Sequence, residues 1–155
     1  VGIDINPARR AMALELGATH AFDGGTADFA GHAAAAGCPA GFDYIIDTTG
    51  LAILVNDAIL ALAPRGELAL VGAYEPGTSV VADTTHIMSA GRVIRGVVEG
   101  GADPQAFIPE LIAHYKAGRF PFDRLIAFFA FKDLAKAIEA GERGQVIKPV
   151  VRFEH

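Results

Sequence analysis

The chain begins with VGIDINPARR (residues 1–10), in which an apolar run ends in an aspartate and a helix then starts. The apolar run predicts a buried strand over residues 1–4. Asn6 is a favourable N-cap, and Pro7 suits the first helical position because no amide donor is needed there. The stretch therefore predicts a strand, a tight turn and a helix, with the carboxylate of Asp4 at the tip of the strand.

The same alternation of strands and helices continues along the chain. We expect strands at residues 19–23, 42–47, 67–73 and 92–98, helices at 7–16, 28–37, 52–62 and 104–118, a turn at 63–66 (APRG), and a Gly/Pro/Ser loop after residue 73. Alternating elements of this kind predict right-handed crossovers and a parallel sheet, and continuous apolar strands are typical of sheets covered on both faces. The expected fold class is α/β, with a Rossmann-type parallel sheet.

The pattern changes after Gly118. The segment FPFDRLIAFFAF (120–131) is aromatic and interrupted by proline, and VIKPVVRF (146–153) has the composition of a strand. A helix is expected between them, over about residues 132–140. This tail therefore looks like a different layer from the crossover units.

Composition excludes several classes of protein. The chain has 155 residues, 52% of them hydrophobic and 20% charged, which is enough to bury a core and argues against disorder. The net charge of -5 argues against nucleic acid as a partner, because phosphate binding needs clustered Lys and Arg. The lone cysteine, Cys38, excludes an internal disulfide or a cysteine-based zinc cluster and fits a cytoplasmic location. No run is long enough to span a bilayer, so no membrane partner is expected.

Asp4 suggests a nucleotide-binding role. In a dinucleotide-binding sheet, an acidic residue after the second strand accepts hydrogen bonds from the adenosine ribose, and it repels a 2′-phosphate. An aspartate there favours NAD over NADP. The glycine fingerprint that should precede it is absent, since neither Gly24-Gly25 nor Gly100-Gly101 has the required spacing. We therefore expect the phosphate-binding half of the fold to lie upstream of Val1.

Several motifs together resemble the medium-chain zinc-dependent alcohol dehydrogenases, over essentially the whole chain and in order. The branch most similar is that of the aryl-alcohol (benzyl alcohol) dehydrogenases, through GVVEG (96–100), FIPEL (107–111) and GRFPFD (118–123). The resemblance implies an NAD-dependent enzyme that oxidises aromatic primary alcohols to aldehydes by hydride transfer, with zinc as a second cofactor. It also implies a truncated NAD-binding domain over residues 1–118 and a segment over 119–155 that returns to a catalytic domain not included here.

The resemblance also implies which residues contact the coenzyme. Asp4, together with Ile5 and Arg9, would lie at the adenosine ribose, and Lys148 would reach the pyrophosphate. Surface roles for Arg9 and Lys148 are about as plausible. The remaining positions would line the ribose and nicotinamide: Thr48, Thr49, Gly50, Val71, Gly72, Ala73, Val97 and Glu99. Of these, Val97 and Glu99 would act through backbone groups. In this family the zinc ligands come from the amino-terminal catalytic domain, so neither metal ligands nor catalytic residues are expected in this chain.

The expected strand order has physical consequences. Rossmann sheets run 3-2-1-4-5-6, so loss of the first strand removes the middle and leaves two unpaired strand ladders. We therefore expect the isolated chain to bind NAD poorly and to lack dehydrogenase activity. The edge strand at Arg92–Val98 is the expected contact of a homo-oligomer.

Two other functions stay open at this point. One is a non-catalytic Rossmann-like module that acts as a partner or regulator. The other, less favoured, is an S-adenosylmethionine-dependent methyltransferase, which also binds a ribose with an acidic residue after its second strand. That fold usually ends in an antiparallel hairpin, which this sequence does not suggest.

Overall fold

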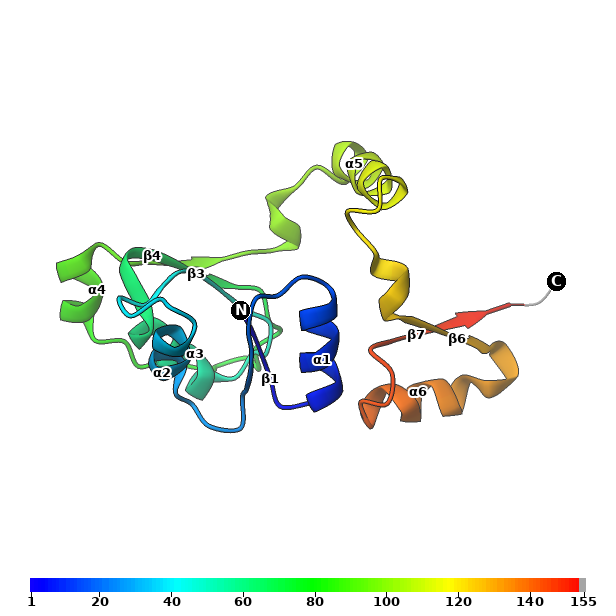
Figure 1. Cartoon of the computed structure of the whole chain (residues 1–155), viewed down its shortest axis with the longest axis horizontal. Helices are drawn as coiled ribbons and strands as arrows, with labels where there is room; N and C mark the ends of the chain where they lie inside the picture. The colour runs from blue at the N-terminus through cyan, green and yellow to red at the C-terminus, as the bar shows by residue number, and fades with distance from the viewer. Residues whose placement is uncertain (154–155) are drawn as a thin grey trace. The chain divides into compact units, whose positions relative to one another are not determined.

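The computed structural model describes residues 1–153 as an α/β protein of short parallel strands and helices (Figure 1). In chain order the elements are β1 (Gly2–Asp4), α1 (Pro7–Glu15), β2 (Ala21–Asp23), α2 (Phe29–Ala35), β3 (Phe42–Asp47), α3 (Ala52–Leu60), β4 (Leu62–Leu70), α4 (Thr84–Ala90), β5 (Val93–Gly96), η1 (Glu99–Gly101), α5 (Pro104–Lys116), η2 (Phe122–Leu125), β6 (Ile126–Ala130), η3 (Phe131–Asp133), α6 (Leu134–Glu142) and β7 (Lys148–Arg152). In the part of the chain that the structure describes, no helix is long and apolar enough to cross a membrane.

The chain divides into two compact units. The first contains Val1–Ile5 and Thr19–Gly101, and the second contains Asn6–Ala18 and the described residues from Ala102 onward. The first unit therefore carries β1 to β5 with helices α2 to α4, and the second carries α1, α5, α6, β6 and β7. The predicted boundary after residue 118 stays a prediction.

All strands of the first unit pair in parallel, as predicted. β1 pairs with β2, with Asp4 opposite Asp23, and β3, β4 and β5 form a second sheet in that order. Within residues 1–153, β1 pairs only with β2, and β3 has a partner on one side only. The pairing is thus interrupted between β1 and β3, at the place that the Rossmann strand order assigns to the first strand of the sheet.

The core of the first unit lies on one face of its strands. Val55 and Ile59 of α3 and Leu62 and Leu68 of β4 are almost completely buried. Ile3 of β1 packs against the same cluster, so the two sheets share one core. Alternate β3 side chains point the other way, because successive residues of a strand face opposite sides of the sheet, and Tyr44 and Ile46 are strongly exposed there.

The sequence predicted a turn at residues 63–66 before a strand at 67–73, whereas β4 already begins at Leu62 and includes these residues. The turn lies inside β4 as an irregularity: Phe42 pairs with Leu62, whereas Tyr44 pairs with Glu67. Arg65 has a left-handed backbone (φ 64°), and a Cβ on Gly66 would lie 2.8 Å from the carbonyl oxygen of Phe42. A glycine at 66 therefore lets the extra residues loop out while the strand continues.

The loop predicted after residue 73 contains a helix that the sequence did not suggest. α4 is only seven residues long and begins with two threonines, which are weak helix formers. It forms because the Asp83 carboxylate accepts hydrogen bonds from the amides of Thr85 (2.8 Å) and His86 (3.2 Å). Arg92, just beyond the helix, donates back to the carbonyl of His86 at 2.7 Å.

In the second unit the structure confirms the predicted helices and strands. Asn6 caps α1, accepting from the amide of Ala8 at 2.8 Å, and its side-chain amide donates to the carbonyl of Gly144 at 3.1 Å. β6 and β7 pair in parallel from Ile126 opposite Lys148 to Ala130 opposite Arg152. Asp103 caps α5 as expected, with Pro104 in the first turn.

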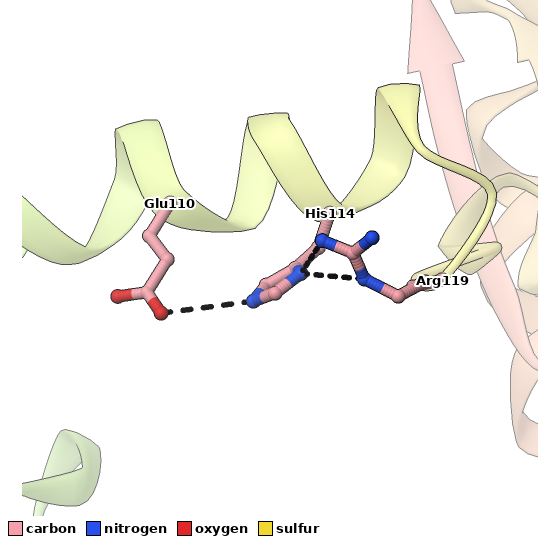
Figure 2. A network of polar contacts seen from close by, with 3 residues as sticks. All are labelled: Glu110, His114 and Arg119. Carbon is pink, nitrogen blue, oxygen red and sulfur yellow. Dashed lines mark hydrogen bonds and ion pairs between the residues drawn. The ribbon is translucent and has the colours of Figure 1, made fainter.

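The carboxyl end of α5 carries a polar network (Figure 2). Arg119 donates from Nε (3.2 Å) and Nη2 (3.0 Å) to Nδ1 of His114, whose Nε2 lies 3.6 Å from the carboxylate of Glu110. The amide of Arg119 also donates to the carbonyl of His114 at 2.9 Å. A guanidinium at this position stabilises the negative end of the helix dipole, and Gly118, with a left-handed backbone (φ 71°), ends the helix.

Replacing Leu68 tests the core. Leu68→Ala should lower the free energy of unfolding by about 3 kcal/mol, because a fully buried leucine leaves a cavity. Leu60→Ala, at a leucine that is 57% exposed, is the matched control and should change it by less than about 0.5 kcal/mol. Urea denaturation followed by circular dichroism measures both, and equal losses would contradict this description of the core.

Candidate functional site

The candidate site lies at the carboxyl ends of β3, β4 and β5. These strands are parallel, so the segments that follow them meet at one edge of the sheet. Residues 48–50, 71–73 and 97–99 are these segments, and they contain most of the positions predicted to contact a coenzyme. In open α/β sheets, ligands bind at this edge.

The backbone of Asp47, the last residue of β3, joins the first two segments. Its carbonyl oxygen accepts hydrogen bonds from the amides of Val71 (2.9 Å) and Gly72 (3.0 Å). The strand pairing of β3 and β4 thus extends one step beyond the last residue of β4, and the start of the 71–73 segment is fixed relative to β3.

The side chain of Asp47 extends this connection. It is 7% exposed and is the only buried charged residue in the described part of the chain. One carboxylate oxygen accepts from the hydroxyl (2.6 Å) and the amide (3.2 Å) of Thr49. The other accepts from the amide of Gly50 (3.1 Å) and from the hydroxyl of Tyr74, four residues beyond β4. The carboxylate therefore links the turn after β3 to the loop after β4.

The environment keeps Asp47 charged and Tyr74 neutral. Burial raises the pKa of Asp47, but the hydrogen bonds from Thr49, Tyr74 and the Gly50 amide together lower it below its usual range. Burial, and then the hydrogen bond to Asp47, raise the pKa of Tyr74 well above the ordinary value for a phenol. At neutral pH the contact is therefore a phenol donating to a carboxylate, the stronger, charge-assisted kind of hydrogen bond.

Two glycines let the backbones of these segments touch. Gly50 has a left-handed backbone (φ 70°), and a Cβ there would lie 3.0 Å from the carbonyl carbon of Ala73 and closer still to its oxygen. A Cβ on Gly72 would lie 3.0 Å from Cα of Gly50 and closer still to its amide nitrogen. Both positions exclude a side chain because backbone atoms occupy the space.

A pocket of about 670 Å³ lies beside this junction. It is lined by Leu70, Val71, Gly72, Tyr74, Gly96, Val97, Val98 and Glu99. The amide of Val97 donates to the carbonyl of Leu70 at 3.0 Å, which holds the third segment against the second. The lining is mostly apolar with a few polar groups, and the pocket is open to solvent.

The other predicted residues lie elsewhere. Asp4 ends β1, where its carbonyl accepts from the amide of Gly24 (3.3 Å), and Ile5 beside it is 73% exposed. Both belong to the first unit but do not line the pocket. Arg9 on α1 and Lys148 at the start of β7 belong to the second unit. The coenzyme roles of these four residues stay predictions.

No metal site is apparent in residues 1–153. No group of three or more His, Cys, Asp or Glu side chains in this part of the chain is arranged to hold a metal ion. Cys38 is exposed in the turn after α2. The residues described here therefore do not fit a zinc ion.

Sequence reasoning missed Asp47 and Tyr74. The signal for Asp47 was available, because a carboxylate directly ends an apolar strand and precedes the flagged residues Thr48, Thr49 and Gly50. Tyr74 gave no comparable signal, since its partner lies 27 residues away in the sequence. Only the parallel pairing of β3 and β4 brings the two together.

Comparison with known proteins identifies the class. Residues 1–116 match the family model for zinc-binding dehydrogenases, and the chain belongs to that family. This agrees with the resemblance to medium-chain zinc-dependent alcohol dehydrogenases and favours it over the methyltransferase alternative. NAD and zinc are the cofactors typical of these enzymes.

Individual relatives are similar over almost the whole chain. A curated geraniol dehydrogenase from Castellaniella defragrans is 41% identical over 99% of this chain. The solved benzyl alcohol dehydrogenase from Acinetobacter calcoaceticus matches 98% of the chain with a TM-score of 0.93 and 34% identity. A zinc-binding domain protein of alcohol dehydrogenase type from Burkholderia ambifaria matches 99% with a TM-score of 0.93 and 39% identity. The chain spans only 41% of the first relative, and 42% and 41% of the two solved chains.

The glycine contact can be tested by adding one methyl group. Gly72→Ala should lower the free energy of unfolding by about 2–3 kcal/mol, because the new Cβ meets backbone atoms that cannot move independently. Gly96→Ala is the matched control, since a Cβ there would meet nothing within 4 Å, and we expect a change below about 0.5 kcal/mol. Chemical denaturation measures both, and a Gly72→Ala variant as stable as Gly96→Ala would refute the close contact.

Proposed function

We propose that this chain is the coenzyme-binding and carboxyl-terminal part of an NAD-dependent, zinc-containing alcohol dehydrogenase. The reaction would be the transfer of a hydride from a primary alcohol to nicotinamide, giving the aldehyde. The family match and the alcohol dehydrogenases among the relatives support this reaction class. Residues 1–118 would form the coenzyme domain and residues 119–155 would return to the catalytic domain.

The observation that carries the proposal is the junction at the carboxyl ends of β3 and β4, with the pocket beside it. The close backbone contacts of Gly50 and Gly72 hold the segments after β3 and β4 together, and Val71, Val97 and Glu99 line the adjoining pocket. A nicotinamide ring would fit this mostly apolar space, with backbone groups of residues 97 and 99 facing its carboxamide. Thr48, Thr49 and Ala73 would flank the attached ribose.

At the other end of the coenzyme, Asp4 would bind the adenosine ribose, with Ile5 and Arg9 beside it. Lys148 would contribute a positive charge to the pyrophosphate. Asp4 ends a parallel strand, as an acidic ribose ligand does in dinucleotide-binding sheets. Its carboxylate would oppose the 2′-phosphate of NADP.

The proposed substrate is an aromatic primary alcohol. Support comes from the similarity to a benzyl alcohol dehydrogenase. The relative named for geraniol, which is not aromatic, supports a different primary alcohol. Since the substrate contacts would come mostly from outside this chain, comparing benzyl alcohol and geraniol as substrates of the parent enzyme decides between them.

Three further properties belong to the same proposal. The isolated chain would be inactive, because the described residues do not form a metal site and the sheet is interrupted between β1 and β3. The parent would be a homo-oligomer through the strand at Arg92–Val98, since β5 is an edge of its sheet. A cytoplasmic location would fit the exposed free thiol of Cys38.

Coenzyme preference tests the proposed function directly. Titrating the chain with NAD and NADP, followed by amide chemical shifts, should show weak NAD binding that perturbs residues 48–50, 71–73 and 97–99. NADP should bind about fivefold more weakly, because like-charge repulsion near Asp4 costs about 1 kcal/mol at 4 Å in a high dielectric. Asp4→Ser should abolish that preference.

Asp23→Ser is the matched control, because Asp23 is paired with Asp4 across β1 and β2 and ends the neighbouring strand. It should leave the preference for NAD unchanged. Equal affinity for NAD and NADP in the unmodified chain would contradict the role given to Asp4. Shift changes confined to the second unit would contradict the proposed site.

A further inference from the structure

Tyr74 contacts both the pocket and the buried carboxylate of Asp47, and no residue predicted from the sequence does both. Tyr74 lines the pocket beside residues 97–99, and its hydroxyl donates to the buried carboxylate of Asp47. The same carboxylate accepts from Thr49 and Gly50 in the turn after β3. One charged group therefore connects a pocket wall to the turn that would flank the coenzyme ribose.

We propose that Asp47 is a positioning residue of the coenzyme site, which acts through Tyr74 to hold the 71–74 loop against the turn at 48–50. This inference rests on the proposed function, because it concerns the site that would bind NAD. Asp47 does not touch the coenzyme in this proposal. Its carboxylate oxygens are both occupied by protein donors, which leaves it unsuited to bind a ligand or to transfer a proton.

The position of Tyr74 in the chain explains why this connection matters. Residues 75–81, which follow it, are all exposed. The chain is next held where the amide of Val81 donates to the side chain of Asn56 (2.9 Å) and where Ala82 packs on the core. Tyr74 is therefore the residue through which the chain is bonded to β3 just before the exposed segment 75–81 begins. Without the hydrogen bond from Tyr74 to Asp47, the unattached part of the chain would begin earlier and would include the residues that line the pocket.

The charge on Asp47 makes the connection specific. A carboxylate only accepts hydrogen bonds, and Tyr74, Thr49 and Gly50 all present donors to it. Asparagine has the same shape but carries an NH₂ group that cannot accept. Asp47→Asn should therefore leave the amide of Gly50 or the hydroxyl of Tyr74 without an acceptor and should loosen the 71–74 loop.

The bond to Tyr74 can be measured without any coenzyme. The chain has three tyrosines and no tryptophan, so phenolate absorbance is easily followed. The difference between the titration curves of the unmodified chain and of Tyr74→Phe is the signal of Tyr74. In the Asp47→Asn background, the difference between Asp47→Asn and the double variant Asp47→Asn/Tyr74→Phe gives the same signal. We expect the Tyr74 midpoint to fall by about one pH unit or more in Asp47→Asn, because the neighbouring negative charge is lost.

Amide hydrogen exchange and NAD titration test the positioning role. In Asp47→Asn, exchange at residues 49–50 and 71–74 should rise by about tenfold or more, while amides in β2 and α4 keep their rates. NAD affinity, from amide shifts, should fall by about threefold or more. The matched control is Asp83→Asn, at another aspartate of the same unit that accepts backbone amides, but at the start of α4. It should leave the Tyr74 midpoint, the amide exchange at residues 49–50 and 71–74, and the affinity for NAD unchanged.

The outcomes separate the possible failures. A Tyr74 midpoint unchanged by Asp47→Asn would overturn the connection itself. Local exchange that rises while NAD affinity stays unchanged would overturn the positioning role and leave a purely structural one. If NAD perturbs no amide shifts in the unmodified chain, the proposed function fails in this chain, and the role of Asp47 towards NAD fails with it. Amide exchange and the phenolate titration then still decide whether Asp47 holds the 71–74 loop.

Discussion

The candidate site depends on the close contact between the turns that follow β3 and β4. Gly72 lies against the backbone of Gly50, and Gly50 lies against the backbone of Ala73, so closely that neither glycine tolerates a Cβ. Asp47 holds the contact from both its backbone and its side chain, accepting from Val71 and Gly72 with its carbonyl and from Thr49, Gly50 and Tyr74 with its carboxylate. Every segment proposed to touch the nicotinamide half of the coenzyme starts at or beside this contact.

The physical chemistry of a buried charge explains what holds this contact together. Taking a carboxylate out of water is unfavourable unless hydrogen bonds replace its hydration. Asp47 receives these bonds from groups on two segments far apart in the sequence, so the charge is stable only when both segments are in place. The lowered pKa of Asp47 and the raised pKa of Tyr74 are two expressions of this arrangement. A pocket built beside it has a wall whose position is set by the sheet itself.

Much of the fold could be predicted from local patterns. The cap at Asn6, the apolar strands and the strand–helix alternation were sufficient for the parallel sheet and for most helices, because these signals depend on neighbouring residues. The looped segment at Arg65 within β4 and the short helix α4 could not be predicted, since both depend on partners distant in the sequence. The same reason hid Tyr74, whereas Thr48, Thr49 and Gly50 were reached through the family resemblance.

The central claim is that a dinucleotide would lie across the junction of β3 and β4. Intermolecular nuclear Overhauser effects between NAD and the isotope-labelled chain measure this most directly. We predict contacts from the nicotinamide protons to the methyl groups of Val71 and Val97, and from the adjoining ribose protons to residues 48–50. Contacts confined to other surfaces, such as helix α5 or strands β6 and β7, would contradict the account.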